Sequence, residues 1–319
     1  MKKTIQWGII GPGKIAHKFA EGMASVPNTT LYAVASRSKE RAESFAHQYN
    51  VPKAYDSYVD LVNDPNVDVI YVATTNNFHY EHAKLCIEHN KACVCEKPFT
   101  LTVSESEQLI SLAKKSNTFL MEALWTRFLP SIDTAEKLIK QGKIGTITHI
   151  DVNFGFETQF SQESRLFNPQ LGGGALYDIG IYPIFFAMHF LGTPSKILAD
   201  AQKTHDGVDI HNRITFEYQN NVTAHLESSF VKDLPCEATI FGTKGKIQFA
   251  RMWHCPTQVS LQQGNVTRDV EIQYVGNGYN YEIQEVCNCI WQNKQESSKL
   301  PLHNTLERIK IINKILSFH

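Results

Sequence analysis

A glycine-rich turn near the N-terminus constrains the fold more than any other feature of this sequence. Residues 4–10, TIQWGII, form an apolar run of strand length, and residues 11–16, GPGKIA, follow at once. The pattern over residues 14–26 favours a helix. A G-x-G-x-x-A sequence that leaves a strand and opens a helix is typical of a dinucleotide-binding βαβ unit. The alternative, a glycine-rich turn without a ligand, fits this context less well.

Each small residue of the turn has a physical reason. Gly11 allows the tight turn, Gly13 lets a pyrophosphate approach the backbone, and Ala16 keeps the helix close to the sheet. The free N–H groups at the helix start, including those of Lys14 and Ile15, carry partial positive charge and suit phosphate oxygens. The sequence therefore predicts a dinucleotide site at this turn.

The first half of the chain alternates strand and helix patterns. The predicted strands are 4–10, 30–36, 67–74 and 92–95, and the predicted helices are 14–26, 39–49, 58–63, 80–89 and 104–115. Ser104 is the expected N-cap of the last helix, with Glu107 completing a capping box. Such alternation predicts a doubly wound parallel sheet with helices on both faces.

The second half is richer in strands. Strand-like segments cover 147–156, 197–204, 210–219, 222–230, 237–242 and 245–250, and helical patterns cover 175–191, 279–292 and 306–318. Turn residues such as those at 219–221 and 242–245 favour hairpins between neighbouring strands. A chain of 319 residues also exceeds what one core usually supports, so two domains are expected.

Composition excludes several classes of partner. The formal net charge is −1, whereas nucleic-acid-binding proteins usually carry a basic excess. No run reaches the roughly 20 apolar residues of a membrane span, so no membrane partner is expected. The seven cysteines are odd in number and lack metal-site spacing, which favours reduced thiols and a cytoplasmic protein.

The tip of the second predicted strand bears on the choice of cofactor. An NAD-binding site usually has an acid there for the ribose 2′-hydroxyl. Here the strand ends at Ser36 and Arg37, and the next acid, Glu40, falls inside the following helix. A hydroxyl and a guanidinium suit a 2′-phosphate, and Arg41 could add charge. NADP is therefore the expected cofactor, with NAD possible; a solvated loop arginine is the alternative for Arg37.

Several motifs together resemble the Gfo/Idh/MocA oxidoreductases. They are the glycine-rich turn, Thr74-Thr75-Asn76 with His79, Glu96-Lys97-Pro98, MEALWTRFLP at 121–130 and GGGALYDIGIYPI at 172–184. The last two are similar to the branch that holds dimeric dihydrodiol dehydrogenases and NADP-linked xylose dehydrogenases. The resemblance implies a Rossmann domain, residues 1–122, followed by an α+β domain, residues 123–319, whose sheet is open and mostly antiparallel.

The resemblance also implies where the cofactor binds. Glu96 resembles a ligand of the nicotinamide ribose, and Lys97 a catalytic group near the substrate, at the carboxyl ends of the parallel strands. The full set of expected cofactor-binding residues is Gly11, Gly13, Lys14, Ile15, Ser36, Arg37, Thr74, Asn76, His79, Glu96 and Lys97.

The implied activity is hydride transfer between NAD(P) and a hydroxyl-bearing carbon of a sugar or trans-dihydrodiol. The expected catalytic residues are Lys97, Asp178 and Tyr182; Asp178 and Tyr182 are four residues apart, so on a helix they share one face. Tyr182 is the expected acid/base, with Lys97 polarising the substrate oxygen; the reversed assignment is a close second. The expected pocket residues are Trp125, Arg127 and Phe154. Alternatives are a non-catalytic regulator of the same fold and an imine- or biliverdin-type reductase.

Two further expectations concern metals and assembly. His149 and His211 lack the spacing of metal ligands, and the chemistry needs no metal, so none is expected. The second-domain sheet has too few helices to cover both faces, and its strands read as imperfectly alternating. Relatives bury that face against a second copy, so a homodimer or dimer of dimers is expected.

Overall fold

The computed structural model describes residues 2–318, and this part of the chain divides into two compact units. The first unit is Met1–Phe128 with Val275–Ile309, and the second is Leu129–Tyr274 with Lys310–His319. Both are discontinuous in sequence because residues 275–309 return to the first unit. The domain boundary predicted between residues 122 and 123 stays a prediction.

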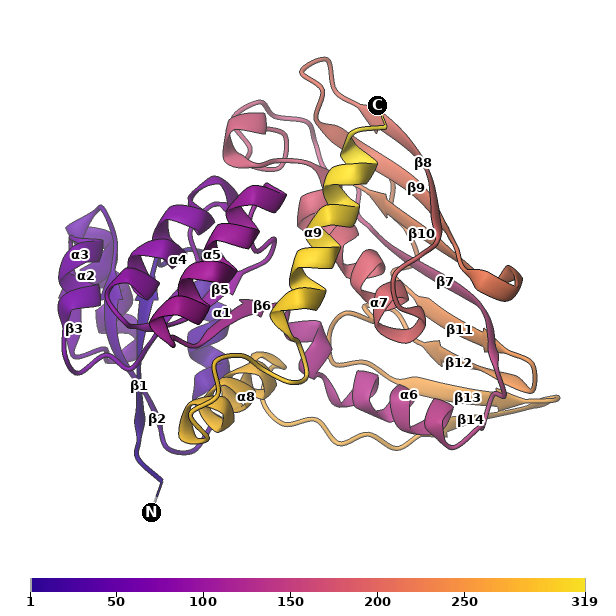
Figure 1. Cartoon of the computed structure of the whole chain (residues 1–319), viewed down its shortest axis with the longest axis horizontal. Helices are drawn as coiled ribbons and strands as arrows, with labels where there is room; N and C mark the ends of the chain where they lie inside the picture. Colours follow the sequence, from indigo (N-terminus) through magenta and orange to yellow (C-terminus); the bar gives the residue numbers. More distant parts are fainter. Residues whose placement is uncertain (1, 319) are drawn as a thin grey trace. The chain divides into compact units, whose positions relative to one another are not determined.

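A six-stranded parallel sheet forms the centre of the first unit (Figure 1). Its order is β3-β2-β1-β4-β5-β6, so the direction of winding reverses between β1 and β4. The strands are β1 (Ile5–Ile10), β2 (Thr29–Ala35), β3 (Lys53–Tyr55), β4 (Val69–Val72), β5 (Ala92–Glu96) and β6 (Leu120–Ala123). The predicted parallel sheet is confirmed, and the short strands β3 and β6 are additions to it.

Helices cover both faces of this sheet. They are α1 (Lys14–Met23), α2 (Lys39–Tyr49), α3 (Tyr58–Asn63), α4 (His79–Glu88), α5 (Val103–Ser116) and α8 (Tyr279–Trp291), with 3₁₀ turns η1 (Asn76–Phe78) and η2 (Trp125–Phe128). One face packs Cys93 and Leu109 into a buried cluster, while on the other Tyr71 stacks on Phe19 of α1. The doubly wound arrangement is therefore as predicted.

The capping box of α5 lies two residues earlier than predicted. Thr102, not Ser104, is the N-cap: its hydroxyl accepts from the Glu105 N–H, and the Glu105 carboxylate accepts from the Thr102 N–H. Thr102 and Glu105 have the same S/T-x-x-E spacing as the predicted pair, so the sequence contains two overlapping signals. The structure uses the earlier capping box, Thr102 with Glu105, and the helix begins at Val103.

The second unit contains an eight-stranded sheet in the order β14-β13-β12-β11-β7-β10-β9-β8. Within this sheet, as far as the structure describes it, only the β7–β10 pairing is parallel. The strands are β7 (Ile147–Gly155), β8 (Lys196–Lys203), β9 (Asp209–Glu217), β10 (Thr223–Ser229), β11 (Ala238–Gly242), β12 (Gly245–Phe249), β13 (Val259–Gln263) and β14 (Val266–Val270). The mostly antiparallel sheet is confirmed, and β13 and β14 were not predicted.

Helices of the second unit lie against one face of this sheet. They include α6 (Pro130–Lys140), which was not predicted, and α7 (Ile181–Leu191), which contacts β7 and β10 (Figure 1). Three turns, η3 (Pro169–Leu171), η4 (Leu176–Gly180) and η5 (Gln219–Asn221), complete the unit. The C-terminal helix α9 (Leu302–Leu316) contributes its first half to the first unit and its second half to this one.

Two central strands of this sheet, β9 and β10, alternate between buried and exposed residues over the middle of their length. On β9, Ile214 and Phe216 are buried while Arg213 is exposed, and on β10, Leu226 is buried while His225 is exposed. This part of the face opposite α7 is therefore largely polar, with the half-buried Phe241 of β11 beside His149 as an exception. An antiparallel sheet can leave such a face to water, so the alternation does not by itself require a second copy, and the homodimer stays a prediction.

One helical stretch, Pro169–Leu191, is long and apolar enough by composition to cross a membrane. The sequence analysis predicts no run of that kind. In the structure 67% of its most apolar window is buried inside the protein, which is how a core helix of a globular domain behaves. The stretch is therefore weak evidence for a membrane span.

Candidate active site

The glycine-rich turn between β1 and α1 accepts only glycine at its first position. Gly11 has φ +87°, and a Cβ there would lie 2.8 Å from Cγ2 of Thr74. Its N–H donates to Ala35 O at the end of β2, which ties the turn to the neighbouring strand. The close approach of Gly11 and Thr74 brings the ends of β1 and β4 together at the point where the winding reverses.

The start of α1 has the features of a phosphate site. Gly13 is the N-cap, and within residues 2–318 no side chain caps this helix end. A Cβ at Gly13 would meet nothing nearer than Ala73 O at 4.0 Å, so the space above the backbone is open. Lys14 and Ile15 begin the helix, and no acid falls in its first turn. These residues fit the pyrophosphate of a dinucleotide.

The tip of β2 presents a guanidinium and no carboxylate. Ser36 is buried and its hydroxyl accepts from the Ser38 N–H at 3.2 Å, which shapes the tip. The exposed Arg37 places its Cζ 5.4 Å from the centre of the Phe78 ring in η1, a cation–π contact. Arg37 is thus held beside the turn that follows β4, where it can reach a 2′-phosphate.

His79 joins two loops of the first unit. Its Nδ1 lies 2.7 Å from Pro98 O and its Nε2 lies 3.1 Å from Thr74 O. Burial lowers the pKa of His79, and a neutral imidazole can donate to only one of these carbonyls. His79 therefore links the loop after β4 to the loop after β5. Its predicted contact with the cofactor stays a prediction, as does that of Asn76, which opens η1.

The carboxylate of Glu96 is buried at the end of β5. It accepts hydrogen bonds from the Tyr71 hydroxyl and, at 3.1 Å, from the Lys97 N–H. Burial raises its pKa to about 7, against the opposing effects of those hydrogen bonds and the Lys97 ammonium. A second buried carboxyl, Glu282 of α8, has its pKa raised by burial and by Glu96. Glu96 therefore titrates near neutrality, unlike an ordinary surface glutamate.

The segment after Glu96 is fixed by an ion pair that the sequence analysis missed. The Lys97–Pro98 peptide bond is cis. The next residue, Phe99, donates its N–H to the Glu122 carboxylate at 3.2 Å. Glu122 is fully buried and pairs with the buried Arg308 of α9. Only the folded chain brings β6 and α9 together, so no local pattern could have shown this pair.

Two expected pocket residues also belong to the first unit. Trp125 is buried and stacks on Tyr279, with ring centres 4.4 Å apart. Arg127 is buried and its Nε donates to Lys299 O at 2.9 Å. One donor of Arg127 is therefore committed to the backbone, and the predicted substrate contacts of both residues stay predictions.

In the second unit, Asp178 and Tyr182 lie on a helix that begins irregularly. Residues Leu176–Gly180 form a π turn, and the regular α7 starts only at Ile181. The prediction of one α-helix from 175 to 191 is corrected in this respect. Such π turns are frequent at functional sites. Asp178 accepts from both terminal nitrogens of Arg165 at 3.1 Å, which holds the carboxylate in place.

The triple glycine before this turn is explained by crowding within the protein. A Cβ at Gly173 would lie 2.8 Å from each of three backbone carbonyl oxygens, those of Arg165, Leu166 and Asn168. Gly174 has φ +127°, and a Cβ there would overlap the Asp209 carboxylate. The buried Asp209 in turn accepts from the Leu176 N–H at 2.7 Å. These two glycines therefore position the turn that carries Asp178.

Tyr182 lies in an aromatic cluster. Its ring centre is 5.8 Å from that of Phe154 on β7 and 5.4 Å from that of His254, and the last two rings stack at 3.9 Å. Tyr182 and His254 are both buried. Phe154 lies beside Tyr182, and its predicted contact with the substrate stays a prediction. The sequence analysis missed His254 because it stands outside any motif.

The fold and the two sets of residues define a nicotinamide-dinucleotide-binding oxidoreductase. Residues 5–124 match the model of an oxidoreductase family with an NAD-binding Rossmann fold, and residues 132–248 match the Gfo/Idh/MocA C-terminal domain. The chain belongs to the Gfo/Idh/MocA oxidoreductases.

Individual relatives agree with this assignment. The chain is 34% identical over 309 residues to trans-1,2-dihydrobenzene-1,2-diol dehydrogenase of Xenopus tropicalis, covering 93% of this chain and 92% of that enzyme. An aldose-aldose oxidoreductase from Caulobacter crescentus, solved with glycerol, has a TM-score of 0.91 at 23% identity, covering 98% and 96%. A 3-ketoreductase from Actinomadura kijaniata, solved with NADP and TDP-benzene, has a TM-score of 0.89 at 22% identity, covering 99% and 98%. The two solved structures support the fold.

Proposed function

We propose that this protein is an NADP-preferring dehydrogenase of trans-dihydrodiols or sugars, acting on a hydroxyl-bearing carbon. The main support is the 34% identity with a trans-1,2-dihydrobenzene-1,2-diol dehydrogenase over nearly the whole chain. The aromatic cluster of Tyr182, Phe154 and His254 agrees with it, since aromatic rings suit an arene diol and also stack on sugars.

The cofactor supplies the hydride acceptor or donor at its nicotinamide ring. In the proposal Gly13, Lys14 and Ile15 bind the pyrophosphate and Glu96 binds the nicotinamide ribose. The buried Tyr71 hydroxyl orients the Glu96 carboxylate. His79 keeps the loops after β4 and β5 together.

The protein must also move the hydroxyl proton of the substrate. We assign this proton to Tyr182 and give Lys97 the task of polarising the substrate oxygen. Arg165 holds the Asp178 carboxylate one turn before Tyr182, so Asp178 acts as a positioning residue. Lys97 as the proton carrier is the alternative assignment, and pH profiles of the two variants distinguish them.

The NADP preference rests on Arg37. Its guanidinium is exposed at the tip of β2, beside Phe78, and the position that an NAD-binding carboxylate would take is held by Ser36. A guanidinium offers paired donors to a phosphate group, which the 2′-hydroxyl of NAD lacks.

Assembly and location complete the proposal. We assign the protein to the cytoplasm, on its reduced cysteines, and to a homodimer or dimer of dimers joined through the outer face of the eight-stranded sheet. The second assignment rests on the resemblance to relatives that bury this face against a second copy; Leu198 of β8, 47% exposed on this face, offers a position at which to test it.

A substrate screen tests the function. Purified protein is mixed with NADP⁺ or NAD⁺ and a panel of trans-dihydrodiols and aldoses. In a second set it is mixed with NADPH and dicarbonyl compounds or imines. Absorbance at the reduced nicotinamide band is followed. Reduction of NADP⁺ by a dihydrodiol or an aldose is expected. Turnover of dicarbonyls or imines alone would overturn the proposed substrate class.

A further inference from the structure

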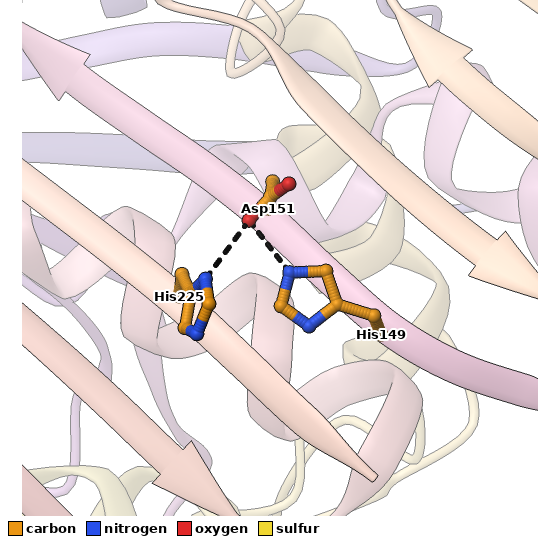
Figure 2. A group of neighbouring side chains, drawn as sticks. All are labelled: His149, Asp151 and His225. Atoms are coloured by element: carbon orange, nitrogen blue, oxygen red, sulfur yellow. Dashed lines mark hydrogen bonds and ion pairs between the residues drawn. The ribbon is translucent and has the colours of Figure 1, made fainter.

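Three metal-ligating side chains gather on the outer face of the eight-stranded sheet. His149 and Asp151 are two residues apart on β7, so they point to the same face. His225 lies directly opposite Asp151 on the parallel neighbour β10. Figure 2 shows both rings turned toward the Asp151 carboxylate.

The distances place the three ligand atoms around one point. His149 Nε2 lies 2.7 Å and His225 Nδ1 lies 3.4 Å from the same oxygen, Asp151 Oδ1. One ligand atom from each residue lies within 4.8 Å of the other two. In a tetrahedral zinc site neighbouring ligand atoms are roughly 3.3 Å apart, which follows from bonds of about 2.0 Å. Small side-chain rotations therefore suffice to admit an ion.

Thr223 orients the first of these ligands. It lies opposite His149 in the β7–β10 ladder, and its hydroxyl oxygen is 2.7 Å from His149 Nδ1. When Nε2 carries the proton, His149 donates to Asp151 at 2.7 Å and Nδ1 accepts from the Thr223 hydroxyl. When Nδ1 carries the proton and donates to Thr223, the lone pair of Nε2 faces the Asp151 carboxylate and is available to a cation. A histidine ligand held by a second hydrogen bond of this kind is typical of protein metal sites.

In the single chain the cluster is open to solvent, and it is separate from the residues assigned to catalysis. The exposed side-chain fractions are 23% for His149, 51% for Asp151 and 60% for His225. Because the proposed dimer uses the same face, water or a group of the second copy completes the coordination. Between His149 and Asp151, Ile150 points to the buried face of the sheet, where α7 carries Tyr182. An ion here cannot touch the Tyr182 hydroxyl.

We propose that His149, Asp151 and His225 bind one divalent transition-metal ion of the zinc class. Two imidazoles and one carboxylate suit zinc, nickel or copper, whereas magnesium and calcium prefer oxygen ligands alone. The alternative is that the three side chains form only hydrogen bonds and ion pairs on the sheet surface. That alternative predicts no stoichiometric metal binding, so a metal titration distinguishes it from the proposed site.

Isothermal titration calorimetry with ZnCl₂ tests the proposal on the full chain, freed of any affinity tag and treated with EDTA before dialysis. One ion per chain is expected in the parent, with no heat from MgCl₂. His225→Ala and Asp151→Asn should abolish the binding, and Thr223→Val should weaken it by roughly tenfold to a hundredfold. His211→Ala is the matched control, because His211 lies on the same face but pairs with Glu227. Circular dichroism verifies that each variant is folded.

Two outcomes would overturn the proposal. The first is a parent protein that binds no zinc, or that binds it as well after His225→Ala. The second concerns separateness from catalysis: EDTA should remove the ion and leave dehydrogenase turnover unchanged. A loss of turnover that zinc restores would place the metal in the chemistry instead.

Discussion

Tyr71 of β4 donates its hydroxyl to the Glu96 carboxylate at the end of the neighbouring strand β5. Both side chains are buried, and Tyr71 also stacks on Phe19 of α1. A hydrogen bond and a packed ring therefore fix the carboxylate beside the proposed ribose site. The same burial that fixes Glu96 raises its pKa to about 7 from an ordinary value of 4.5.

This shift predicts how stability depends on pH. The folded protein holds a proton on Glu96 between about pH 4.5 and 7 that the unfolded chain has released, so stability falls as the pH rises through this window. The loss reaches about 3 kcal/mol above pH 7. Glu96→Gln should remove this part of the pH dependence. Urea unfolding of the cofactor-free parent and variant at several pH values measures it.

The exposed Glu107 supplies the matched control for this experiment. Glu107→Gln should leave the pH dependence of unfolding as it is in the parent. A constant difference in unfolding free energy between the parent and Glu96→Gln from pH 4.5 to 7 would show that the folded Glu96 titrates like an ordinary glutamate.

The buried pair of Glu122 and Arg308 makes a second prediction. Glu122→Gln keeps the size of the side chain but leaves the Arg308 guanidinium buried without its counter-charge. Such a change typically costs about 3–5 kcal/mol of unfolding free energy. The double variant Glu122→Gln/Arg308→Met should recover most of that loss. A cost below about 1 kcal/mol for Glu122→Gln alone would mean that water reaches Arg308.

Arg37 should decide which dinucleotide binds better. Arg37→Asp is expected to weaken NADP binding by about tenfold to a hundredfold, the usual worth of hydrogen bonds to a charged group, while NAD binding changes little. Fluorescence titration with both dinucleotides gives the two dissociation constants. Arg41→Ala, in the first turn of α2 and four residues after Arg37, is the comparison and should weaken NADP binding less. Equal affinity of the parent for NADP and NAD would refute the preference.

Leu198 gives a test of the proposed assembly. The parent should scatter light as a particle of at least twice the 36.1 kDa of one chain. Leu198→Asp, which places a charge on the exposed apolar position of the outer sheet face, should shift the protein toward the monomer. Val266→Asp is the control, because Val266 is 68% exposed on β14, at the far end of the sheet from β8. A parent mass of a single chain would end this proposal.

Much of the fold could be predicted because it depends on local periodicity. The strand before Gly11 and the helix after it follow from the order of apolar and small residues, and so does the alternation through β5. Strands β3, β6 and β14 were not predicted because they are short, and β14 is also largely exposed. The π turn at 176–180 was not predicted because its apolar pattern is that of an α-helix.

The site was less predictable because several of its contacts join distant parts of the sequence. Gly11 and Arg37 stand in local motifs; the structure shows why position 11 requires glycine, and the contact of Arg37 with NADP stays a prediction. Glu122 with Arg308 and Tyr182 with His254 are pairs that only the folded chain brings together. The cluster around Asp151 was missed for the same reason, since His225 comes from another strand.

The most direct test of the account is the turnover of Tyr182→Phe with NADP⁺ and the best substrate of the screen. Turnover should fall by a factor of about 10² to 10⁴, which is the usual contribution of an acid/base group to the rate, while NADP⁺ still binds. Lys97→Ala should show a similar loss, and Tyr177→Phe, at a tyrosine of the preceding π turn, should keep its activity. Unchanged turnover in Tyr182→Phe would contradict the account.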